Sequence, residues 1–477
     1  PGITRAHRIA QCREMGVPVV EEPFTLEEMM NADEVFFTSA SALCCRIEEI
    51  DGKDVINKEI VRLSEIIYDT DLLSEKKKQS QNPVYVDLVK TFVTATDNFI
   101  AYRPSFGLYT ILAGFPWFLD WGRDSLISFE GLLLKTRRFS IAKEVLLTTI
   151  RDVKFGLVPN GYSGYDNRPL YNSVDASLLL FEQVKKFLNY TSEYEWIKTN
   201  IYPSLEKIIE AYTGHIDVDG NNIYMDEDGL ISSGTCDTQN TWMDAKIGNF
   251  AVTPRNGKAV EINSMWYNAL KIMEELTILT KGKQDAKKYA ELAKKCKESF
   301  EKKFYNKKRK CLYDVIGDSK IRPNQIFALS LSYPVIEPNT EVARQIFDIV
   351  TKKLYTPYGL RTLAKGEEGF RDRYEGDMIK RDMSYHQGTI WPWLLGQYYN
   401  ALNNMIKSEK KKTVKAELEE QMVKFRQEVA STFIDEMYHN ATIGNIFELY
   451  SGTNKKYYPG GAYAQAWSVA EIFRIII

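Results

Sequence analysis

Apolar residues recur at spacings of three and four from about residue 57 to the C-terminus, which is the period of helices with one buried face. One such stripe, flanked by lysines that water can solvate, is Tyr289, Leu292, Cys296, Phe300 and Phe304. The pattern predicts about twelve helices, near residues 85–100, 124–134, 139–153, 173–190, 193–213, 260–281, 284–303, 322–332, 338–352, 387–407, 411–434 and 463–476.

The connections between these helices alternate in length. The link at 134–139 is short, whereas those at 214–259, 353–386 and 435–462 are long. Plain helical hairpins are joined by loops of about two to eight residues, and much longer loops are usually functional. We therefore expect a mainly all-α fold, a toroid of helical hairpins whose long loops gather at one end. A helical solenoid is the alternative, although no repeat of roughly 30–45 residues is visible.

The first part of the chain has a different pattern. Runs at 34–39 and 45–50 are typical of strands, a turn is expected at Asp51 and Gly52, and residues 25–30 are typical of a short helix. Such a piece is too short to bury a core by itself. The sequence thus predicts an α/β fragment at 1–56, a linker and lead-in helix at 57–84, and a helical domain at 85–477.

Composition excludes several classes of protein. The 477 residues include 62 Lys and Arg against 64 Asp and Glu, a near balance that argues against binding to nucleic acid. No run of roughly 18 apolar residues is present to span a membrane. Six cysteines without paired C-x-x-C spacing, and only four histidines, favour a reducing cytoplasm over a disulfide framework and indicate no metal site. The chain begins at Pro1 without a signal segment, so we expect that it was processed or trimmed, or that its start is missing.

The candidate chemistry lies in the long loops. Of the eight tryptophans, all but Trp196 fall in or beside four segments rich in carboxylates and amides, at 114–124, 241–266, 384–393 and 445–467. A sugar ring has an apolar face that stacks on an indole and a rim of hydroxyls that bind carboxylates, amides and guanidinium groups. One Trp beside one Asp is more often a buried aromatic near a helix cap. Four such clusters on separate loops predict a shared carbohydrate pocket.

Glycoside hydrolysis requires two carboxyl groups, one protonated and one ionised. The candidate acid is Asp244, two residues after Trp242, whose indole would desolvate the carboxyl group and favour its neutral form. The candidate base is Glu448, in the loop before the last helix. Asp175 could instead cap a helix that begins near Ser173. The carboxylates that could take either role, or bind sugar hydroxyls, are Asp120, Asp124, Asp175, Glu261 and Asp382.

The run from about 85 to 477 closely resembles the glucosidase domain of glycogen debranching enzymes, the amylo-α-1,6-glucosidase. The resemblance rests on the motifs at 115–124, 172–177, 241–246, 253–258 and 386–393. It implies an (α/α)6 barrel, an inverting mechanism, no cofactor and no metal. Related barrels place the acid between the fifth and sixth helices and the base between the eleventh and twelfth, and Asp244 and Glu448 occupy those loops in the helix count above.

The resemblance implies a substrate-binding set around the two carboxyl groups. His386 could bind a sugar hydroxyl or be structural. The residues expected to shape the glucose pocket and its walls are Trp117, Asp120, Trp121, Arg123, Asp124, Asn172, Asp175, Trp242, Lys246, Lys258, Glu261, His386, Gln387, Trp391, Gln465 and Trp467.

The resulting hypothesis is hydrolysis of α-1,6-linked glucose stubs on glycogen or another α-glucan, in the cytoplasm, with no nucleic-acid or membrane partner. Inversion predicts a gap of roughly 6.5–9.5 Å between the two carboxyl groups. Three alternatives stay open: another barrel glycosidase acting on α-1,4 links or trehalose, a non-catalytic glycan-binding relic, and a pyridoxal-phosphate transaminase. The oligomeric state is not predicted.

The transaminase alternative comes from the N-terminal fragment. Residues 2–5, 19–24, 32–39 and 50–53 resemble the C-terminal part of a branched-chain or D-amino-acid aminotransferase. In that family Ile3, Thr4 and residues near 39–41 would hold the phosphate of pyridoxal phosphate, and the Schiff-base lysine lies earlier than any residue present here. The resemblance therefore implies a fusion or chimeric fragment, joined near residues 54–60, that cannot run the transamination.

Overall fold

The computed structural model describes residues 83–163, 167–439, 444–452 and 456–477, together with four short strands near the N-terminus. Strand β1 (Phe36–Phe37) pairs antiparallel with β2 (Cys45–Arg46), and β3 (Glu49–Ile50) pairs antiparallel with β4 (Lys53–Asp54). Strands β1 to β3 fall within the two predicted strand runs. The predicted turn at 51–52, the predicted helix at 25–30 and the residues implied to hold pyridoxal phosphate lie outside the described residues.

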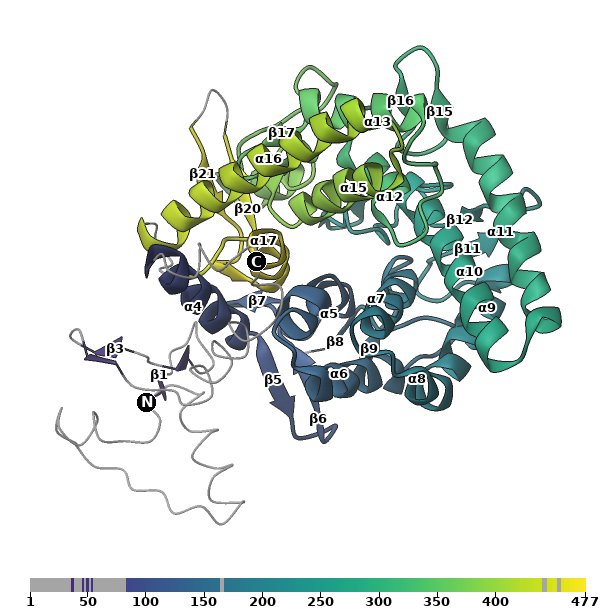
Figure 1. Ribbon diagram of the computed structural model, residues 1–477, viewed down its shortest axis with the longest axis horizontal. Coiled ribbons are helices and arrows are strands. Elements are labelled where there is room, and N and C mark those ends of the chain that lie inside the picture. Colours follow the sequence, from purple (N-terminus) through teal and green to yellow (C-terminus); the bar gives the residue numbers. More distant parts are fainter. Residues whose placement is uncertain are drawn as a thin grey trace.

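An inner set of helices makes a closed cycle of contacts, in which each packs against the next and the last packs against the first (Figure 1). In order of contact they are α5 (Gly122–Phe129), α7 (Ala176–Thr191), α10 (Val260–Thr280), α12 (Phe327–Ser330), α15 (Leu394–Ser408) and α17 (Ala466–Ile476). The π-helical turn η3 (Glu130–Leu134) continues α5, and the 3-10 turn η4 (Pro323–Ile326) leads into α12.

A second set of helices lies around the outside of this cycle (Figure 1). These are α4 (Pro83–Asp97), α6 (Phe139–Arg151), α8 (Tyr194–Asn200), α9 (Tyr202–Thr213), α11 (Lys283–Phe304), α13 (Glu341–Lys353) and α16 (Lys412–His439). Each inner helix follows an outer helix in the sequence. The chain therefore alternates between the outside and the inside of the cycle.

Burial explains which helices are inner and which are outer. Helix α10 is buried along most of its length, as expected for a helix surrounded by others. Helix α11 buries one face only, and the predicted stripe forms that face, with Phe300 and Phe304 stacked at 4.4 Å between ring centroids. Full burial of one such side chain contributes about 1.5–3 kcal/mol.

Every predicted helix has an observed counterpart, with three differences in detail. The helix predicted at 193–213 divides at Ile201 into α8 and α9, and Pro203 lies in the first turn of α9, where its missing N–H is tolerated. The helix predicted from 387 begins only at Leu394, because residues 390–391 form strand β19. Helix α14 (Met378–Ser384) lies within a connection that was predicted as loop.

The connections into the inner helices carry short antiparallel strands. The strands are β5 (Ile100–Arg103), β6 (Leu108–Ile111), β7 (Gly114–Phe115), β8 (Gly161–Tyr162), β9 (Pro169–Leu170), β10 (His215–Ile216), β11 (Ile223–Met225), β12 (Ile231–Ser232), β13 (Lys246–Ile247), β14 (Phe250–Ala251), β15 (Tyr305–Asn306), β16 (Cys311–Leu312), β17 (Tyr355–Thr356), β18 (Gly359–Arg361), β19 (Ile390–Trp391), β20 (Leu449–Ser451), β21 (Tyr458–Gly460) and β22 (Ala464–Gln465).

Two pairings join connections that are distant in the sequence. In the sheet β17-β18-β19-β20-β21, Ile390 of β19 pairs with Tyr450 of β20, which ties the segment before α15 to the segment before α17. Strand β22 pairs with β7, Gln465 opposite Gly114, which ties the segment before α17 to the segment before α5. The connections therefore meet at one end of the helical cycle.

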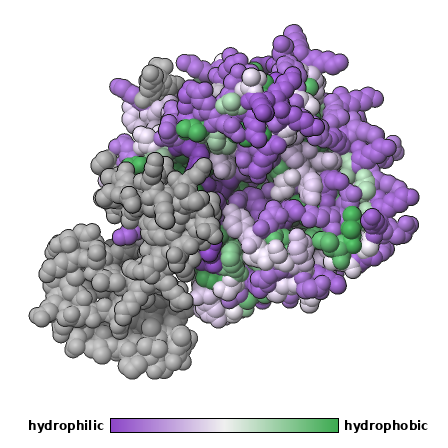
Figure 2. All heavy atoms as spheres, viewed as in Figure 1, coloured by the Kyte–Doolittle hydropathy of each residue, from purple (hydrophilic) through white to green (hydrophobic). Residues whose placement is uncertain are grey.

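The face seen in Figure 2 is mainly hydrophilic, with scattered hydrophobic groups among the coloured residues. Within the described part of the chain, no helix is both long and apolar enough to cross a membrane.

Candidate active site

The predicted site residues lie mainly on the connections that lead into the inner helices. Arg123 and Asp124 stand in the first turn of α5, and Asp175 lies directly before α7. Asp244 lies on the connection before α10, and Glu448 lies on the connection before α17. Side-chain contacts join these connections, so residues far apart in the sequence meet in one cluster.

Arg123 connects two of the carboxylates. Its Nε donates to both carboxylate oxygens of Asp175, at 3.0 and 2.9 Å, and its Nη1 donates to Oδ2 of Asp244 at 2.8 Å. Paired hydrogen bonds of this kind fix the guanidinium plane. The Arg123 side chain is 3% exposed and that of Asp244 is 31% exposed, so Asp244 is held in place while it stays open to a ligand.

The alternative that Asp175 merely caps α7 is wrong. The Asp175 side chain makes no cap hydrogen bond. Instead, Oγ of Ser173 accepts from the N–H of Ala176 at 3.1 Å and donates to Asp175 at 2.9 Å. The Asp175 carboxylate is therefore directed to Arg123.

Glu448 is 3% exposed and is held by two donors. The hydroxyl of Tyr385 donates to Oε1, and the N–H of Ala462 donates to Oε2 at 2.9 Å. Burial raises the pKa of Glu448 to about 7, the two hydrogen bonds oppose that shift, and the nearby charge of Asp244 adds to it. A carboxyl group with a pKa near neutrality is suited to proton transfer at neutral pH.

Asp124 lies in the same cluster. It accepts a hydrogen bond from Nε2 of Gln465 at 3.0 Å. Burial raises the pKa of Asp124 well above its usual range, Arg123 opposes this shift, and Asp244 and Glu448 add to it. Burial also raises the pKa of Asp244, again opposed by Arg123. The charges of Asp244 and Glu448 both act on Asp124, and the charge of Asp244 acts on Glu448, so the three carboxyl groups interact electrostatically.

The predicted aromatic walls form a buried stack. Trp242 contacts the rings of His386, Trp391 and Trp393 edge to face, with centroids 5.3, 5.5 and 5.1 Å away. Trp467 stacks on Trp393 at 5.5 Å. All five side chains are buried. The rings contact one another, and this stack joins the connections before α10 and α15 to the first turn of α17.

His386 lies within that stack, parallel to Trp391 at 5.1 Å. Burial lowers the pKa of His386 well below its usual range, and the charges of Arg322, Arg123 and Arg255 lower it further. The imidazole is therefore neutral at neutral pH. Neither ring nitrogen has a hydrogen-bond partner among the described residues. Its binding to a sugar hydroxyl stays a prediction.

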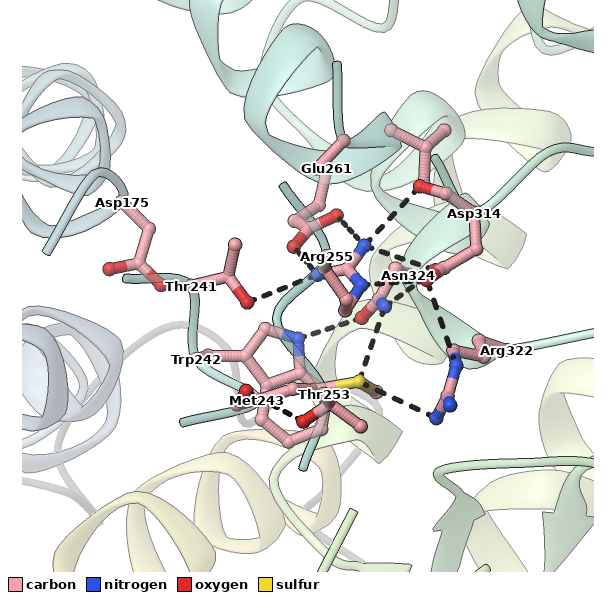
Figure 3. A network of polar contacts seen from close by, with 12 residues as sticks. Asp175, Thr241, Trp242, Met243, Thr253, Arg255, Glu261, Asp314, Arg322 and Asn324 are labelled. Carbon is pink, nitrogen blue, oxygen red and sulfur yellow. Dashed lines mark hydrogen bonds and ion pairs between the residues drawn. The ribbon is translucent and has the colours of Figure 1, made fainter. Parts of the chain in front are cut away.

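A buried polar network supports the segment that contains Trp242 (Figure 3). Nε1 of Trp242 donates to Asn324 at 2.7 Å, and Asn324 donates to Asp314 at 2.8 Å. Arg255 donates to Asp314 at 2.6 Å and binds both carboxylate oxygens of Glu261. Glu261 was predicted to bind substrate, but the structure places it in this supporting network, where Arg255 occupies both of its oxygens.

The same network fixes the backbone on either side of that indole (Figure 3). Nη1 of Arg255 donates to Oγ1 of Thr241 at 3.2 Å, and Oγ1 of Thr253 donates to the carbonyl oxygen of Met243 at 2.9 Å. Asp244 follows Met243 directly. The backbone that leads into Asp244 is therefore held by a buried contact.

Lys258 is not brought to this cluster. Its Nζ donates to Asp226 at 2.6 Å and to Asp228 at 2.7 Å, and Asp228 also accepts from Lys303 of the outer helix α11. The predicted role of Lys258 in substrate binding thus has no support from its position. Asp382, the remaining rival carboxylate, lies partly buried on α14.

Three of the predicted residues, Trp117, Asp120 and Trp121, lie on the segment just before α5. Asp120 forms an ion pair with Arg103 and, with Trp121, lines a small cavity of about 20 Å³, which has room for a water molecule. The Trp121 ring lies against Gly161, where an added Cβ would come within 3.3 Å of the indole. Trp117 is exposed.

The other predicted residues lie at intermediate exposure. Asn172 accepts from Nδ2 of Asn160 at 3.4 Å, and Gln387 accepts from Nη2 of Arg322 at 2.7 Å. Lys246 lies in β13 and pairs there with Ala251. Sequence reasoning missed Tyr385, although it lies inside the predicted segment 384–393, because a phenol without a charge gives no signal of its own.

Comparisons with known proteins agree with this picture. A family model described as amylo-alpha-1,6-glucosidase matches residues 94–474, and one described as amino-transferase class IV matches residues 1–50. The glycogen debranching enzyme of Saccharomyces cerevisiae is 26% identical over 381 residues, which cover 60% of this chain and 24% of that protein. A putative branched-chain-amino-acid aminotransferase of Methanocaldococcus jannaschii is 44% identical over 59 residues, 12% of this chain and 20% of that protein.

Among solved structures, a sialidase superposes with a TM-score of 0.56 at 14% identity, covering 83% of this chain and 33% of that chain. That likeness shows a shared fold. The chain spans about a quarter of the length of the yeast debranching enzyme.

Proposed function

Because this chain belongs to the amylo-α-1,6-glucosidase family, a family of glycoside hydrolases, we propose that it releases glucose from α-1,6 branch stubs of glycogen or a limit dextrin. We assign its helical domain to the six-hairpin (α/α)6 barrels. The closed cycle of inner helices, each preceded by an outer helix, supports that assignment.

The observation that carries the functional proposal is a chain of contacts between the two connections. Arg123 and Asp124 are neighbours at the start of α5; Arg123 donates to Asp244, and Asp124 accepts from Gln465. Gln465 lies three residues after Ala462, whose N–H donates to Glu448. In the proposed reaction, Asp244 gives its proton to the glycosidic oxygen as the bond to the anomeric carbon breaks. Glu448 takes a proton from a water molecule that attacks the anomeric carbon from the opposite face. The product is glucose of inverted configuration, and the proton lost by one carboxyl group is balanced by the proton gained by the other.

The surroundings of each carboxyl group support these roles. Glu448 accepts hydrogen bonds on both oxygens, which favours its ionised form, and its pKa of about 7 suits a base. Asp244 is open to a ligand, and a bound sugar would cover its exposed part and raise its pKa further. Arg123 would hold Asp244 in position, and Asp124 with Gln465 would offer hydrogen bonds to sugar hydroxyls.

The proposal is tested by measuring free glucose from a limit dextrin whose branches have been trimmed to single α-1,6-linked glucose residues, because phosphorylase alone leaves longer branches. We expect Asp244→Asn and Glu448→Gln each to lower kcat by roughly 10²–10⁴-fold. Asp382→Asn is the matched control. It removes a carboxylate of the same kind from α14, and Asp382 makes none of the hydrogen bonds to Asp244 or Glu448 described above.

The configuration of the first product, followed by proton NMR, tests the stereochemistry. Release of β-glucose from the α-linked stub supports inversion, whereas initial release of α-glucose contradicts it. Faster release from linear maltooligosaccharides than from the limit dextrin would favour the α-1,4-glucosidase alternative. Full activity in both carboxylate variants would refute the assignment of the pair.

A further inference from the structure

Two large aromatic side chains lie exposed beside the cluster. Trp117 is 55% exposed and Tyr463 is 49% exposed. Their ring centroids are 5.8 Å apart and their planes meet at 65°. An indole and a phenol ring that contact each other and stay exposed offer aromatic surfaces on which the apolar face of a sugar ring can stack.

The pair is anchored in regular structure. Tyr463 donates its backbone N–H to the carbonyl oxygen of Phe115 at 2.9 Å. The next residue, Ala464, pairs with Phe115 where β22 meets β7. The Tyr463 ring also contacts Phe447, with centroids 6.1 Å apart. Trp117 follows β7 by two residues, and Tyr463 directly precedes β22. Because these two strands pair with each other, little backbone freedom is lost when a ligand binds there.

The pair lies next to the base of the proposed reaction. Tyr463 follows Ala462, whose N–H donates to Glu448, and Phe447 precedes Glu448 in the chain. Neighbouring Cα atoms are about 3.8 Å apart. Glu448 is 3% exposed, whereas Tyr463 is 49% exposed, so an open aromatic ring and a buried carboxyl group lie on adjoining segments.

We propose that Trp117 and Tyr463 form a platform for glucose residues of the chain that carries the branch stub. The platform binds the glucan outside the cleaving pocket, through stacking of the apolar faces of successive sugar rings on two inclined aromatic surfaces. This inference rests on the proposed function for the identity of the glucan. It moves Trp117 from the glucose pocket, where the sequence placed it, to the binding of the remaining chain.

Two substrates separate binding of the chain from cleavage. The trimmed limit dextrin offers a single-glucose stub and its chain, whereas α-D-glucosyl fluoride offers one glucose and no chain. We expect Trp117→Ala and Tyr463→Ala each to lower the ratio of kcat/KM for limit dextrin to kcat/KM for the fluoride by about tenfold. Trp117→Phe, which keeps an aromatic face, should lose less. Tyr194→Ala, which removes a ring 39% exposed on the outer helix α8, is the control and should leave the ratio unchanged.

An equal loss on both substrates, or no loss on either, would overturn the platform. Binding measured without turnover keeps this result independent of the proposed reaction. In a Glu448→Gln background, titration calorimetry with maltoheptaose should show a Kd about tenfold weaker when Trp117 is replaced by Ala. Weaker binding, together with a wild-type protein that cleaves neither substrate, would support the platform and refute the proposed reaction. Unchanged binding with normal cleavage would refute the platform alone.

Discussion

The hydroxyl of Tyr385 is the part of the site whose removal has the most specific expected effect. It donates to Oε1 of Glu448 and lowers the pKa of that carboxyl group, against the effect of burial. Tyr385→Phe removes the donor and keeps the ring. The pKa of Glu448 should therefore rise above about 7. If Glu448 acts as an ionised base, the acidic limb of the pH profile of kcat/KM should move to higher pH.

The size of the change follows from the hydrogen bond that is lost. A hydrogen bond to a charged group contributes about 1.5–3 kcal/mol, and about 1.4 kcal/mol corresponds to one pH unit. The N–H of Ala462 remains to hold the second oxygen. We therefore expect the midpoint of the acidic limb to rise by about one pH unit, and by two at most.

The assay is initial-rate glucose release across pH 5 to 9 with limit dextrin well below KM, so that the profile reports the free enzyme. Tyr374→Phe is the matched control, because its ring contacts Tyr385 at 5.4 Å while the hydrogen bonds to Glu448 come from Tyr385 and Ala462. An active Tyr385→Phe variant whose acidic limb stays in place, or moves to lower pH, would refute the assignment of that limb to Glu448.

Three further predictions concern the groups around the pair. Glu448 has a folded pKa of about 7 against an ordinary 4.5, so the stability that its protonated form contributes is present below 4.5 and is lost as the pH rises through 7. Glu448→Gln should therefore raise the free energy of unfolding by up to about 3 kcal/mol at pH 8 and by little at pH 4.5, as measured in urea. Asn324→Ala leaves the Trp242 N–H without its acceptor and Asp314 without one of its donors. It should lower the free energy of unfolding in urea by about 1–3 kcal/mol and should also lower kcat. Unchanged values would show that the network does not support Asp244. Lys258→Met breaks ion pairs with Asp226 and Asp228 and should change glucose release by less than about twofold, with a stability loss of about 1 kcal/mol or less, whereas a large rise in KM would restore the role that the sequence suggested.

The sequence was sufficient for the helices and for the connections on which Asp244 and Glu448 lie. The helical period distinguishes buried from solvated faces, as the stripe on α11 does, so most of the boundaries were close. Asp244 and Glu448 could be selected because each lies in a long connection, and in this fold long connections lead into neighbouring inner helices.

The sequence could not show which way a side chain in such a connection points. Glu261 and Lys258 belong to the same stretch as Asp244, yet Glu261 is directed to Arg255 and Lys258 is directed to Asp226. No local period operates in irregular backbone, so the partner of each charge depends on tertiary contacts. The indoles illustrate the same limit. The sequence pattern of an aromatic residue close to a carboxylate is the same whether the ring is buried, as that of Trp242 is, or exposed, as that of Trp117 is.

The pairing of β22 with β7 has a consequence for the order in which the site assembles during folding. Helix α17 packs against α5, and Gln465 reaches Asp124 only once the segment at 464–476 is in place. These two residues are 341 positions apart in the sequence, and contacts between such distant segments form slowly because the entropy of closing a long loop must be overcome first. Until that closure the ring is open and the set of groups that would bind the sugar is incomplete. The site should therefore mature in one of the last steps of folding, after the individual helical hairpins have formed.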